Sequence, residues 1–369
     1  MQNSFAGIYQ GKRVLVTGHT GFKGSWLALW LRELGATVYG YSLEAPTEPS
    51  HWALLNLGIR HEIGDIRDGA HLNHFIQEIQ PEIVFHLAAQ PIVRESYRTP
   101  IETYDTNVIG SLRVYDACRT CESVRAVVSI TTDKVYENRE WPWGYRENDP
   151  LGGHDPYSAS KACADIATTS WIRSFWPVNE FGKSHHVLMA SARAGNVIGG
   201  GDWASDRLVP DLMRGAAQGK EATIRNPAST RPWEHVLEPL SGYLLLGQRL
   251  LQGDTSCAKA WNFGPAANGV LTVGEVLAVM SSAWPKLRYR IDPPATAPHE
   301  AGLLTLDCSL ARSELQWKPV WDGTPCFQHT VKWYEAYLTH NSVISLPQLQ
   351  AYVAEARSMN LVWTQRKRP

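Results

Sequence analysis

The chain has 369 residues, of which 44% are hydrophobic, so it can bury a large core and is long enough for two joined units. Its 35 lysines and arginines nearly balance its 36 aspartates and glutamates, which leaves no electrostatic basis for binding nucleic acid or an acidic membrane surface. The six cysteines are scattered as in proteins with reduced thiols, and with no membrane-length apolar stretch and no signal-peptide pattern we expect a cytoplasmic protein without a metal site.

The first predicted elements are a strand over residues 13–17, a glycine-rich turn and an apolar helix over residues 25–34. This order of elements is the context in which a glycine pattern binds a dinucleotide. Gly18 permits the tight turn, Gly21 lets the backbone approach a pyrophosphate, and Gly24 lets the helix pack on the strand. The start of the helix adds N–H groups and the positive end of its dipole. The sequence therefore predicts a cofactor site that includes Gly18, Gly21, Phe22 and Gly24.

Strand and helix patterns then alternate through the first half of the chain, which favours a parallel, doubly wound sheet of the Rossmann type. The further strands expected in this part are 37–41, 60–63, 83–87, 126–130 and 187–192. After about residue 195 the rhythm breaks into loops rich in glycine, proline and tryptophan, and the short strand 261–263 returns to the sheet. We therefore expect an α/β protein with a dinucleotide-binding domain and a smaller C-terminal α/β substrate-binding domain. The first would hold residues 1–195 plus about 236–267, and the second residues 196–235 and 268–369.

The end of the second predicted strand indicates which dinucleotide is bound. A carboxylate there binds the ribose hydroxyls of NAD, whereas a basic residue binds the phosphate of NADP. No arginine or lysine lies beside Ser42, so we expect NAD, although the usual aspartate is missing and Lys23 in the glycine turn leaves NADP open. Asp65 and Ile66 follow the third strand, where a carboxylate can accept from the adenine amino group. Capping the next helix is an equally good interpretation of Asp65.

Tyr157 and Lys161 are four residues apart and therefore share one face of a helix. The lysine ammonium near the phenol would favour the phenolate and lower the tyrosine pKa from about 10 toward neutrality. A phenolate placed in this way can take the proton from an alcohol while hydride leaves the same carbon. Y-x-x-x-K alone is weak evidence for this chemistry, and the glycine turn upstream strengthens it, because it predicts a dinucleotide that could accept the hydride.

Four motifs occur in the order and spacing of a known family: T-G-x-x-G-x-x-G at 17–24, G-D-I-R-D at 64–68, H-L-A-A-Q at 86–90 and Y-x-x-x-K at 157–161. With them the chain, over about residues 10–270, resembles the extended short-chain dehydrogenase/reductase family. Three further segments are similar to its nucleotide-sugar 4,6-dehydratases, and to their CDP-glucose branch: T-T-D-K at 131–134, R-A-G-N-V-I-G-G-G-D-W at 193–203 and R-P-W-E-H-V at 231–236. The resemblance implies a lyase that holds NAD tightly and binds a nucleotide sugar in its C-terminal domain. Its product would be a 4-keto-6-deoxy sugar for deoxysugar synthesis, commonly for bacterial surface polysaccharide.

The resemblance also implies catalytic roles. Thr132 would bond the sugar O4 beside Tyr157, and Lys161 would also bind the nicotinamide ribose. Asp133 would donate a proton to the departing O6, and Lys134 would take the C5 proton. The reverse assignment, with the lysine ammonium as the acid and the aspartate carboxylate as the base, is electrostatically easier and stays open.

Other residues would contact the cofactor or the substrate by the same resemblance. Ala88 and Gln90 would lie at a strand end beside the cofactor, and Asn107 would steady the active site. The residues matched to the nucleotide sugar are Arg94, Asn196, Arg207, Arg231 and His235. A surface salt bridge is the alternative for Arg231, and simple packing is the alternative for Trp233 and His235.

Three other functions stay open. A nucleotide-sugar 4-epimerase would use Tyr157 and Lys161 without a C5 base. A 4,6-dehydratase could also act on dTDP-glucose or GDP-mannose, and an NAD-binding protein without activity could share the fold. Since relatives commonly pair through two long helices, we expect a homo-oligomer, a dimer or a tetramer, formed by the helices near 100–121 and 157–176.

Overall fold

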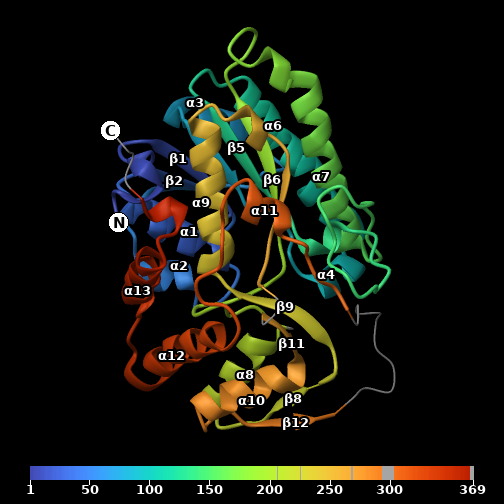
Figure 1. Ribbon diagram of the computed structural model, residues 1–369, viewed down its shortest axis with the longest axis vertical. Helices are drawn as coiled ribbons and strands as arrows, with labels where there is room; N and C mark the ends of the chain where they lie inside the picture. The colour runs from blue at the N-terminus through green and yellow to red at the C-terminus, as the bar shows by residue number, and fades with distance from the viewer. Residues whose placement is uncertain (206, 225, 267–268, 293–302, 366–369) are drawn as a thin grey trace.

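A computed structural model describes residues 1–205, 207–224, 226–266, 269–292 and 303–365 (Figure 1). Its centre is a seven-stranded sheet in the order β10-β6-β5-β4-β1-β2-β3, and every pairing is parallel. The strands are β1 (Arg13–Thr17), β2 (Thr37–Ser42), β3 (Arg60–Ile63), β4 (Ile83–His86), β5 (Ala126–Ile130), β6 (Leu188–Ala194) and β10 (Ala260–Phe263). All seven predicted strands are present with bounds that differ by at most two residues, and the Rossmann-type prediction is confirmed.

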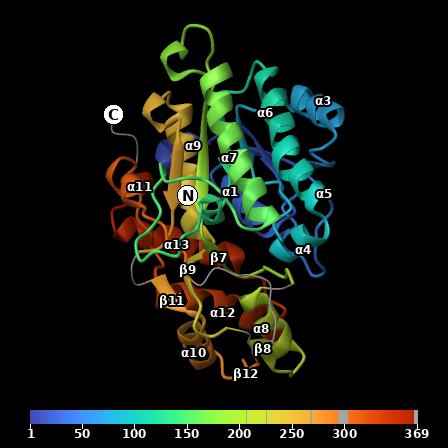
Figure 2. The same cartoon turned by 90° about the vertical axis from the view of Figure 1, so that its right-hand side faces the viewer.

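Helices cover both faces of this sheet. The helices that precede or flank it are α1 (Phe22–Glu33), α2 (His51–Leu55), α3 (Gly69–Ile79), α4 (Val93–Arg98), α5 (Pro100–Tyr104), α6 (Ser111–Arg119), α7 (Pro156–Phe175) and α9 (Leu237–Leu251). Figure 2 looks onto the face covered by α7, α6 and α3, and α1 and α9 lie on the other side. No helix within the described ranges is long and apolar enough to cross a membrane.

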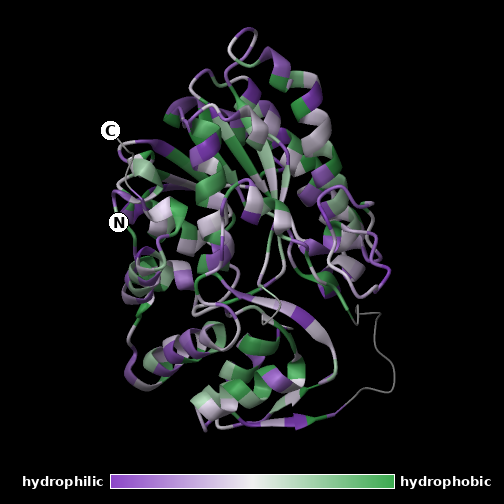
Figure 3. Cartoon of the chain, viewed as in Figure 1, coloured by the Kyte–Doolittle hydropathy of each residue, from purple (hydrophilic) through white to green (hydrophobic). Residues whose placement is uncertain are grey.

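Two apolar clusters form the core, one under each layer of helices. Successive residues of a strand point to opposite faces of the sheet. Val14 and Val16 of β1 therefore join the cluster under α1 and α9, whereas Leu15 joins the cluster under α3 and α6. In Figure 3 the strands in the middle of the large sheet are mostly green to white, and the hydrophilic colour is more frequent on loops and helices. Strands buried on both faces read as continuous apolar runs, which is why the sequence predicts them well.

The second half of the chain adds two small sheets at one end of the molecule (Figure 1). Three strands form one sheet in the order β11-β9-β7, and two more strands form the pair β12-β8. Their bounds are β7 (Asn196–Ile198), β8 (Ala222–Ile224), β9 (Thr230–His235), β11 (Val270–Thr272) and β12 (Tyr289–Ile291). The helices beside them are α8 (Leu208–Ala217), α10 (Val273–Ala283) and α12 (Thr324–His340).

The final part of the chain returns to the large sheet. Helix α11 (Ser309–Ser313) contacts β10, and α13 (Ser345–Ser358) contacts α1. The His51 ring joins these parts, because its two nitrogens bond the hydroxyls of Ser25 in α1 and Ser345 in α13 at 2.8 Å each. Helix α13 falls within residues 268–369, the range expected to form the second domain, yet it contacts α1 of the expected first domain. The division of the chain into two domains therefore stays a proposal.

A buried ion pair ties α7 to the sheet. Arg193 of β6 lies 2.8 Å from Asp165 of α7, and the two side chains are 3% and 0% exposed. Asp165 also accepts hydrogen bonds from the hydroxyls of Thr131 and Ser191. Every carboxylate oxygen of this aspartate is therefore satisfied, and α7 is held in the position that carries Tyr157 and Lys161.

Replacing Arg193 with methionine is expected to lower the free energy of unfolding by about 3–5 kcal/mol, because the Asp165 carboxylate would stay buried without its cation. Urea denaturation measures the change. Lys259→Met is the matched control, since its bond to Glu314 joins side chains that are 39% and 45% exposed and is worth at most about 1 kcal/mol. Equal losses in both variants would contradict the structural role of the buried pair.

Candidate active site

The candidate site lies where the carboxyl ends of β1, β4 and β5 meet. The sheet order reverses beside β1, and such switch points are where open α/β sheets bind their ligands. Gly18 has φ +74°, and a Cβ added there would lie 2.8 Å from the Ala88 nitrogen. A Cβ on Gly24 would lie 2.1 Å from the Gly18 carbonyl oxygen. Both glycines are thus needed for the close approach of turn, helix and neighbouring strand end, and Gly21 is the N-cap of α1, directly before Phe22.

Two hydroxyl groups lie hydrogen-bonded to each other at the end of β2. The Thr20 and Ser42 hydroxyls are 2.8 Å apart, and Thr20 also donates to the Leu43 carbonyl at 2.9 Å. Lys23, which left NADP open, lies instead in the electric field of Glu234 and Asp133. The arrangement favours unphosphorylated ribose at Ser42.

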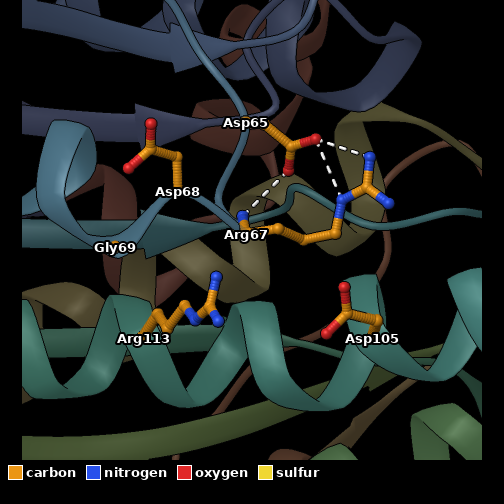
Figure 4. Close-up of a pocket in the computed structure, with 6 residues that line it drawn as sticks. All are labelled: Asp65, Arg67, Asp68, Gly69, Asp105 and Arg113. Atoms are coloured by element: carbon orange, nitrogen blue, oxygen red, sulfur yellow. Dashed lines mark hydrogen bonds and ion pairs between the residues drawn. The ribbon is translucent and has the colours of Figure 1, made fainter.

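Asp65 lines an open recess of about 780 Å³ at the start of α3, shown in Figure 4. Its carboxylate accepts from the Arg67 backbone at 2.8 Å and from the Arg67 guanidinium at 2.7 Å, and this pairing holds the pKa of Asp65 below its usual value. The alternative that Asp65 caps the helix is wrong, because Asp68 is the N-cap and accepts from His71. Ile66 is buried, and a Cβ on Gly110 would come within 2.7 Å of its side chain.

Thr132, Asp133 and Tyr157 form a hydrogen-bonded group at the end of β5. The Thr132 hydroxyl donates to Asp133 Oδ1 at 2.9 Å, and the same hydroxyl lies close enough to the Tyr157 phenol to lower its pKa. Thr132 is 8% exposed and Asp133 is 2% exposed. Thr132 is the N-cap of the short 3₁₀ turn Asp133–Val135 that follows the strand, and Tyr157 is in the first turn of α7. The structure therefore brings together three of the five predicted catalytic side chains.

Burial shifts the pKa values of two members of this group, Asp133 and Tyr157. Burial raises the pKa of Asp133, and the cations of Lys134 and Lys23 and the bond from Thr132 offset only part of that rise. Burial also raises the pKa of Tyr157 to about 12, although the Thr132 bond and Arg207 lower it. The expected shift of this phenol toward neutrality is therefore wrong for the isolated chain.

The hydrogen bond of Lys161 explains why its ammonium does not lower the pKa of Tyr157 as expected. Its Nζ donates to the Ile130 carbonyl at 2.9 Å, and burial, with the nearby Lys23, lowers the pKa of this lysine to about 8. The helix spacing does place Lys161 on the site side of α7, but its ammonium is bonded to the end of β5. An i, i+4 spacing predicts a shared face and not a particular hydrogen bond.

Asn107 links the strand end at Gln90 to α7. Its side-chain oxygen accepts from the Gln90 backbone at 2.8 Å, and its amide donates to the Gln90 carbonyl at 3.1 Å and to Ser160 Oγ at 2.9 Å. Asn107 lies in a π-helical turn, Asp105–Gly110, between α5 and α6. Such turns are often found at functional sites. These bonds join the Gln90 backbone to α7, and the supporting role of Asn107 stays a prediction.

The residues matched to the nucleotide sugar come from three places. Asn196 of β7 lies opposite Trp233 of β9 in the small sheet, and Arg231 is also on β9. Arg207 precedes α8 and bonds Asp202 at 2.8 Å, with 36% of its side chain exposed. Arg94 is on α4, which contacts α7.

Packing is the better interpretation of His235 and Trp233. His235 is 0% exposed and lies against Trp26 and Trp321 at ring-centroid distances of 6.3 and 4.9 Å. Trp233 donates its indole N–H to the Leu271 carbonyl at 3.1 Å and packs against Phe327. The contacts of both side chains are made within the protein, so the substrate-binding role expected for His235 lacks support.

Two ionisable residues near the site were not predicted to have a role in catalysis. Glu234 of β9 is 1% exposed, and Lys23 of α1 is the cation that most favours its ionised form. The signal in the sequence was a carboxylate between Trp233 and His235, in a segment that otherwise reads as a buried strand. Buried carboxylates are rare, so Glu234 is a candidate for a functional role.

The sequence is similar to known proteins over most of its length. The sequence matches the family model of GDP-mannose 4,6 dehydratase over residues 15–328. It is 50% identical to the CDP-glucose 4,6-dehydratase of Salmonella typhimurium over 334 residues, which are 90% of this chain and 92% of that protein.

Solved structures share the fold. An epimerase from Methanothermobacter thermautotrophicus superposes with a TM-score of 0.78 at 22% identity, covering 90% of this chain and 94% of that one. A dTDP-glucose 4,6-dehydratase from Streptomyces venezuelae, solved with NAD bound, superposes with a TM-score of 0.72 at 24% identity, covering 88% and 97%. Epimerases and dehydratases thus have the same architecture, and the fold alone does not separate them.

Proposed function

Because this chain belongs to the family of nucleotide-sugar 4,6-dehydratases, we propose that it converts CDP-D-glucose to CDP-4-dehydro-6-deoxy-D-glucose and water, with NAD as its cofactor. The observation that carries the choice of substrate is the 50% identity to a CDP-glucose 4,6-dehydratase over 92% of that protein. The reaction is a carbon–oxygen lysis without net oxidation.

The residues present fit NAD. A side chain at Gly18 or Gly24 would clash with neighbouring backbone in the turn that would meet a pyrophosphate, and Ser42 offers a hydroxyl to a ribose. Asp65 and Lys161 would contact the adenine and the nicotinamide ribose. Bound NAD supplies the oxidant for C4 and the hydride for C6, and its cationic nicotinamide ring favours a phenolate nearby.

The chain itself moves three protons. Tyr157 takes the proton of the C4 hydroxyl, and Thr132, which lies near the phenol, would bond the same oxygen. The ketone then acidifies the C5 proton, which Lys134 removes. Asp133 donates its proton to O6, so that water leaves. Once C6 has received hydride, C5 takes back a proton from Lys134, which has exchanged with solvent, and Tyr157 and Asp133 return to their starting states through solvent, so that the product and water remain.

Asp133 suits the role of acid. A carboxyl must be protonated to donate, and burial favours the protonated form of this one despite the cations beside it. The reverse assignment needs an ionised Asp133, which the burial opposes. Lys134 is the base at C5 in this proposal, which requires its amine to be neutral while Asp133 holds the proton.

A 4-epimerase is the alternative, because it would use the same fold and the same pair of Tyr157 and Lys161. An epimerase needs Tyr157 and Lys161 but no acid for O6 and no base for C5. The buried Asp133, directly bonded to Thr132 and followed by Lys134, supports the dehydratase.

Mass spectrometry tests the proposed function. Purified protein is incubated in deuterated water with CDP-glucose and, separately, with its dTDP, UDP and GDP counterparts. The expected result is loss of one water with gain of one solvent deuterium, fastest with CDP-glucose. An unchanged mass with an inverted C4 configuration would identify an epimerase, and turnover of another nucleotide sugar alone would overturn the choice of substrate.

We also propose a homo-oligomer formed through α5 to α7. Large apolar side chains are exposed there: Ile101 is 81%, Ile109 is 43% and Ile166 is 53% exposed. They lie on elements that contact one another on the face seen in Figure 2. Contiguous exposed apolar groups mark interaction surfaces.

Replacing Ile101 and Ile166 together with lysine is expected to shift the protein from an oligomer to a monomer, because both charges would be buried in the interface. Light scattering after size-exclusion chromatography measures the mass. Ile291→Lys is the control, since Ile291 is 56% exposed but lies on β12, away from this face. An unchanged mass in the double variant would place the interface elsewhere.

A further inference from the structure

Asp202 is a buried carboxylate that is bonded to Arg207, one of the residues matched to the nucleotide sugar. The Asp202 side chain is 6% exposed, and its Oδ2 accepts from the Arg207 guanidinium at 2.8 Å. Its other oxygen accepts from the Ala204 backbone at 3.1 Å. A nearly buried carboxylate that accepts at both oxygens is held in one orientation, so it also orients the arginine that it bonds.

The Arg207 guanidinium keeps donors for a ligand. A guanidinium has five N–H groups, and within the described ranges the bond to Asp202 is the one side-chain hydrogen bond that Arg207 makes. The Arg207 side chain is 36% exposed, so part of this planar group is open to solvent. The planar fork suits the oxygens of a phosphate group.

The segment that leads to Arg207 begins at the candidate site. A Cβ added to Gly199, directly after β7, would lie 3.2 Å from Phe22 Cζ at the start of α1, so the segment starts beside the cofactor turn. Arg207 also lowers the pKa of Tyr157, which agrees with a guanidinium near the proposed base. A phosphate bound by Arg207 would therefore belong to a ligand in this site.

Close packing fixes the backbone directly before the aspartate. The Trp26 indole donates to the Gly200 carbonyl at 2.9 Å, and a Cβ added to Gly200 would lie 1.9 Å from Trp333 Cγ. Gly201 has φ +85°, and a Cβ there would lie 2.5 Å from His51 Cδ2. Neither position has room for a side chain, so the two glycines let the segment pass between α1, α2 and α12.

Two helices hold the aspartate and the residues after it. The Tyr334 hydroxyl of α12 donates to the Asp202 carbonyl, and the Tyr334 ring lies edge-on to Trp203 at a centroid distance of 5.2 Å. Arg214 of α8 donates to the Trp203 carbonyl at 2.7 Å and to the Ala204 carbonyl at 3.2 Å. The Asp202 carboxylate is therefore anchored to the fold independently of the arginine.

We propose that Asp202 is a positioning residue that holds Arg207 toward the diphosphate of the bound nucleotide sugar. The proposal rests on the proposed function, which supplies the substrate that carries this diphosphate. Asp202 acts through geometry: it occupies one nitrogen of the guanidinium and leaves the other donors to the phosphate oxygens. It makes no contact with the substrate itself, because two anions in contact repel each other.

The test compares Asp202→Ala with the parent by the calorimetric affinity for CDP on the NAD-loaded protein and by the kinetics of CDP-glucose dehydration. Asp202→Ala is expected to raise the Kd of CDP and the KM of CDP-glucose by roughly ten-fold, because Arg207 loses its orientation. The change in kcat is expected to stay below about two-fold, since contacts to the diphosphate hold substrate and transition state equally. A lower kcat with an unchanged KM would overturn the proposal.

Asp202→Asn is the conservative variant. Its amide oxygen can still accept from Arg207 without carrying a charge, so the Kd of CDP is expected to stay within about three-fold of the parent value. This variant also keeps the proposal testable if Asp202→Ala does not fold. A loss of CDP affinity in Asp202→Asn as large as that in Arg207→Ala would overturn the proposal, because the orienting bond would not matter.

A double-mutant cycle shows whether Asp202 acts through Arg207. Arg207→Ala alone is expected to weaken CDP binding by about 10- to 100-fold, the loss of charged hydrogen bonds to phosphate. Adding Asp202→Ala to Arg207→Ala is expected to weaken CDP binding no further, because the residue that Asp202 positions is already absent. An equal effect of Asp202→Ala in both backgrounds would overturn the proposal, and so would parent-like CDP binding in Arg207→Ala.

Asp307→Ala is the matched control. Asp307 makes the same two kinds of bond, since it accepts from the Ser309 backbone at 2.8 Å and pairs with Arg146 at 3.4 Å. It directly precedes α11, which lies beside the large sheet, whereas α8 lies beside the small sheets (Figure 1). Its replacement is expected to lower the melting temperature and leave the Kd of CDP in place. Equal weakening of CDP binding in Asp202→Ala and Asp307→Ala would overturn the proposal.

CDP binding does not require turnover, so the positioning role and the proposed function can fail separately. A parent protein that binds CDP with the expected dependence on Asp202 and Arg207, but does not dehydrate CDP-glucose, would overturn the proposed function and leave the positioning role established. A parent that dehydrates CDP-glucose, with CDP binding and KM unchanged in Asp202→Ala, would overturn the positioning role and leave the proposed function in place.

Discussion

Replacing Tyr157 with phenylalanine is expected to lower kcat for dehydration by about 10³-fold, because the C4 hydroxyl would lose its proton acceptor. The Thr132 hydroxyl would remain and keep its bond to Asp133. It cannot replace the Tyr157 phenol as the proton acceptor, because a threonine hydroxyl is a much weaker acid and does not ionise near neutral pH. Nucleotide-sugar binding is expected to change little, since the phenol is one group among many contacts. Steady-state kinetics and a calorimetric affinity for CDP-glucose separate the two effects.

Tyr136→Phe is the control for Tyr157→Phe. Tyr136 is buried one residue beyond the 3₁₀ turn, donates to Asn262 at 2.7 Å and accepts from Arg193 at 2.8 Å. Its loss is expected to cost about 1 kcal/mol of unfolding free energy and to leave kcat close to that of the parent. A similar loss of kcat in both variants would mean that Tyr157 acts through packing and not as the base.

The large sheet was predictable because its strands carry a local signal. Residues 126–130 read Ala-Val-Val-Ser-Ile and are buried on both faces, and a helix pattern separates them from the strands on either side. The glycine turn was predictable for a similar reason, since Gly18 and Gly24 answer steric demands within a single strand–turn–helix unit.

The pKa values were not predictable, because they depend on contacts between distant segments. The Tyr157 phenol is raised by burial that α7 and β5 create together, and Lys161 is bonded to Ile130, 31 residues away. Glu234 shows the same limit. Its burial follows from the docking of α1 on β7, residues more than 170 positions apart, as in the bond from Trp26 to Gly200. Spacing along a helix or strand does not report such contacts.

Replacing Lys134 with methionine is expected to abolish exchange of the C5 proton with solvent deuterium while reduced cofactor still forms. Tyr157 and Thr132 remain to handle the C4 hydroxyl proton while NAD would accept the hydride, whereas the base at C5 is gone, so exchange should fall by roughly 10²- to 10⁴-fold. Mass spectrometry of recovered nucleotide sugar measures the exchange, and absorbance measures the reduced cofactor. Lys12→Met is the control, since Lys12 is paired with Glu82 at the surface.

Asp133→Asn decides between the two acid–base assignments when it is compared with Lys134→Met. If Lys134 is the base, Asp133→Asn keeps C5 exchange and loses the departure of water, because only the donor to O6 is missing. If Asp133 is the base, the pattern inverts: Asp133→Asn loses exchange, and Lys134→Met keeps it without releasing water. The raised pKa of Asp133, caused by burial, favours the first pattern, because a carboxyl that holds its proton is a donor and not a base. Exchange at the parent rate in Lys134→Met would therefore show that the field of Lys134 outweighs this burial when substrate is bound, and that Asp133 works as the carboxylate.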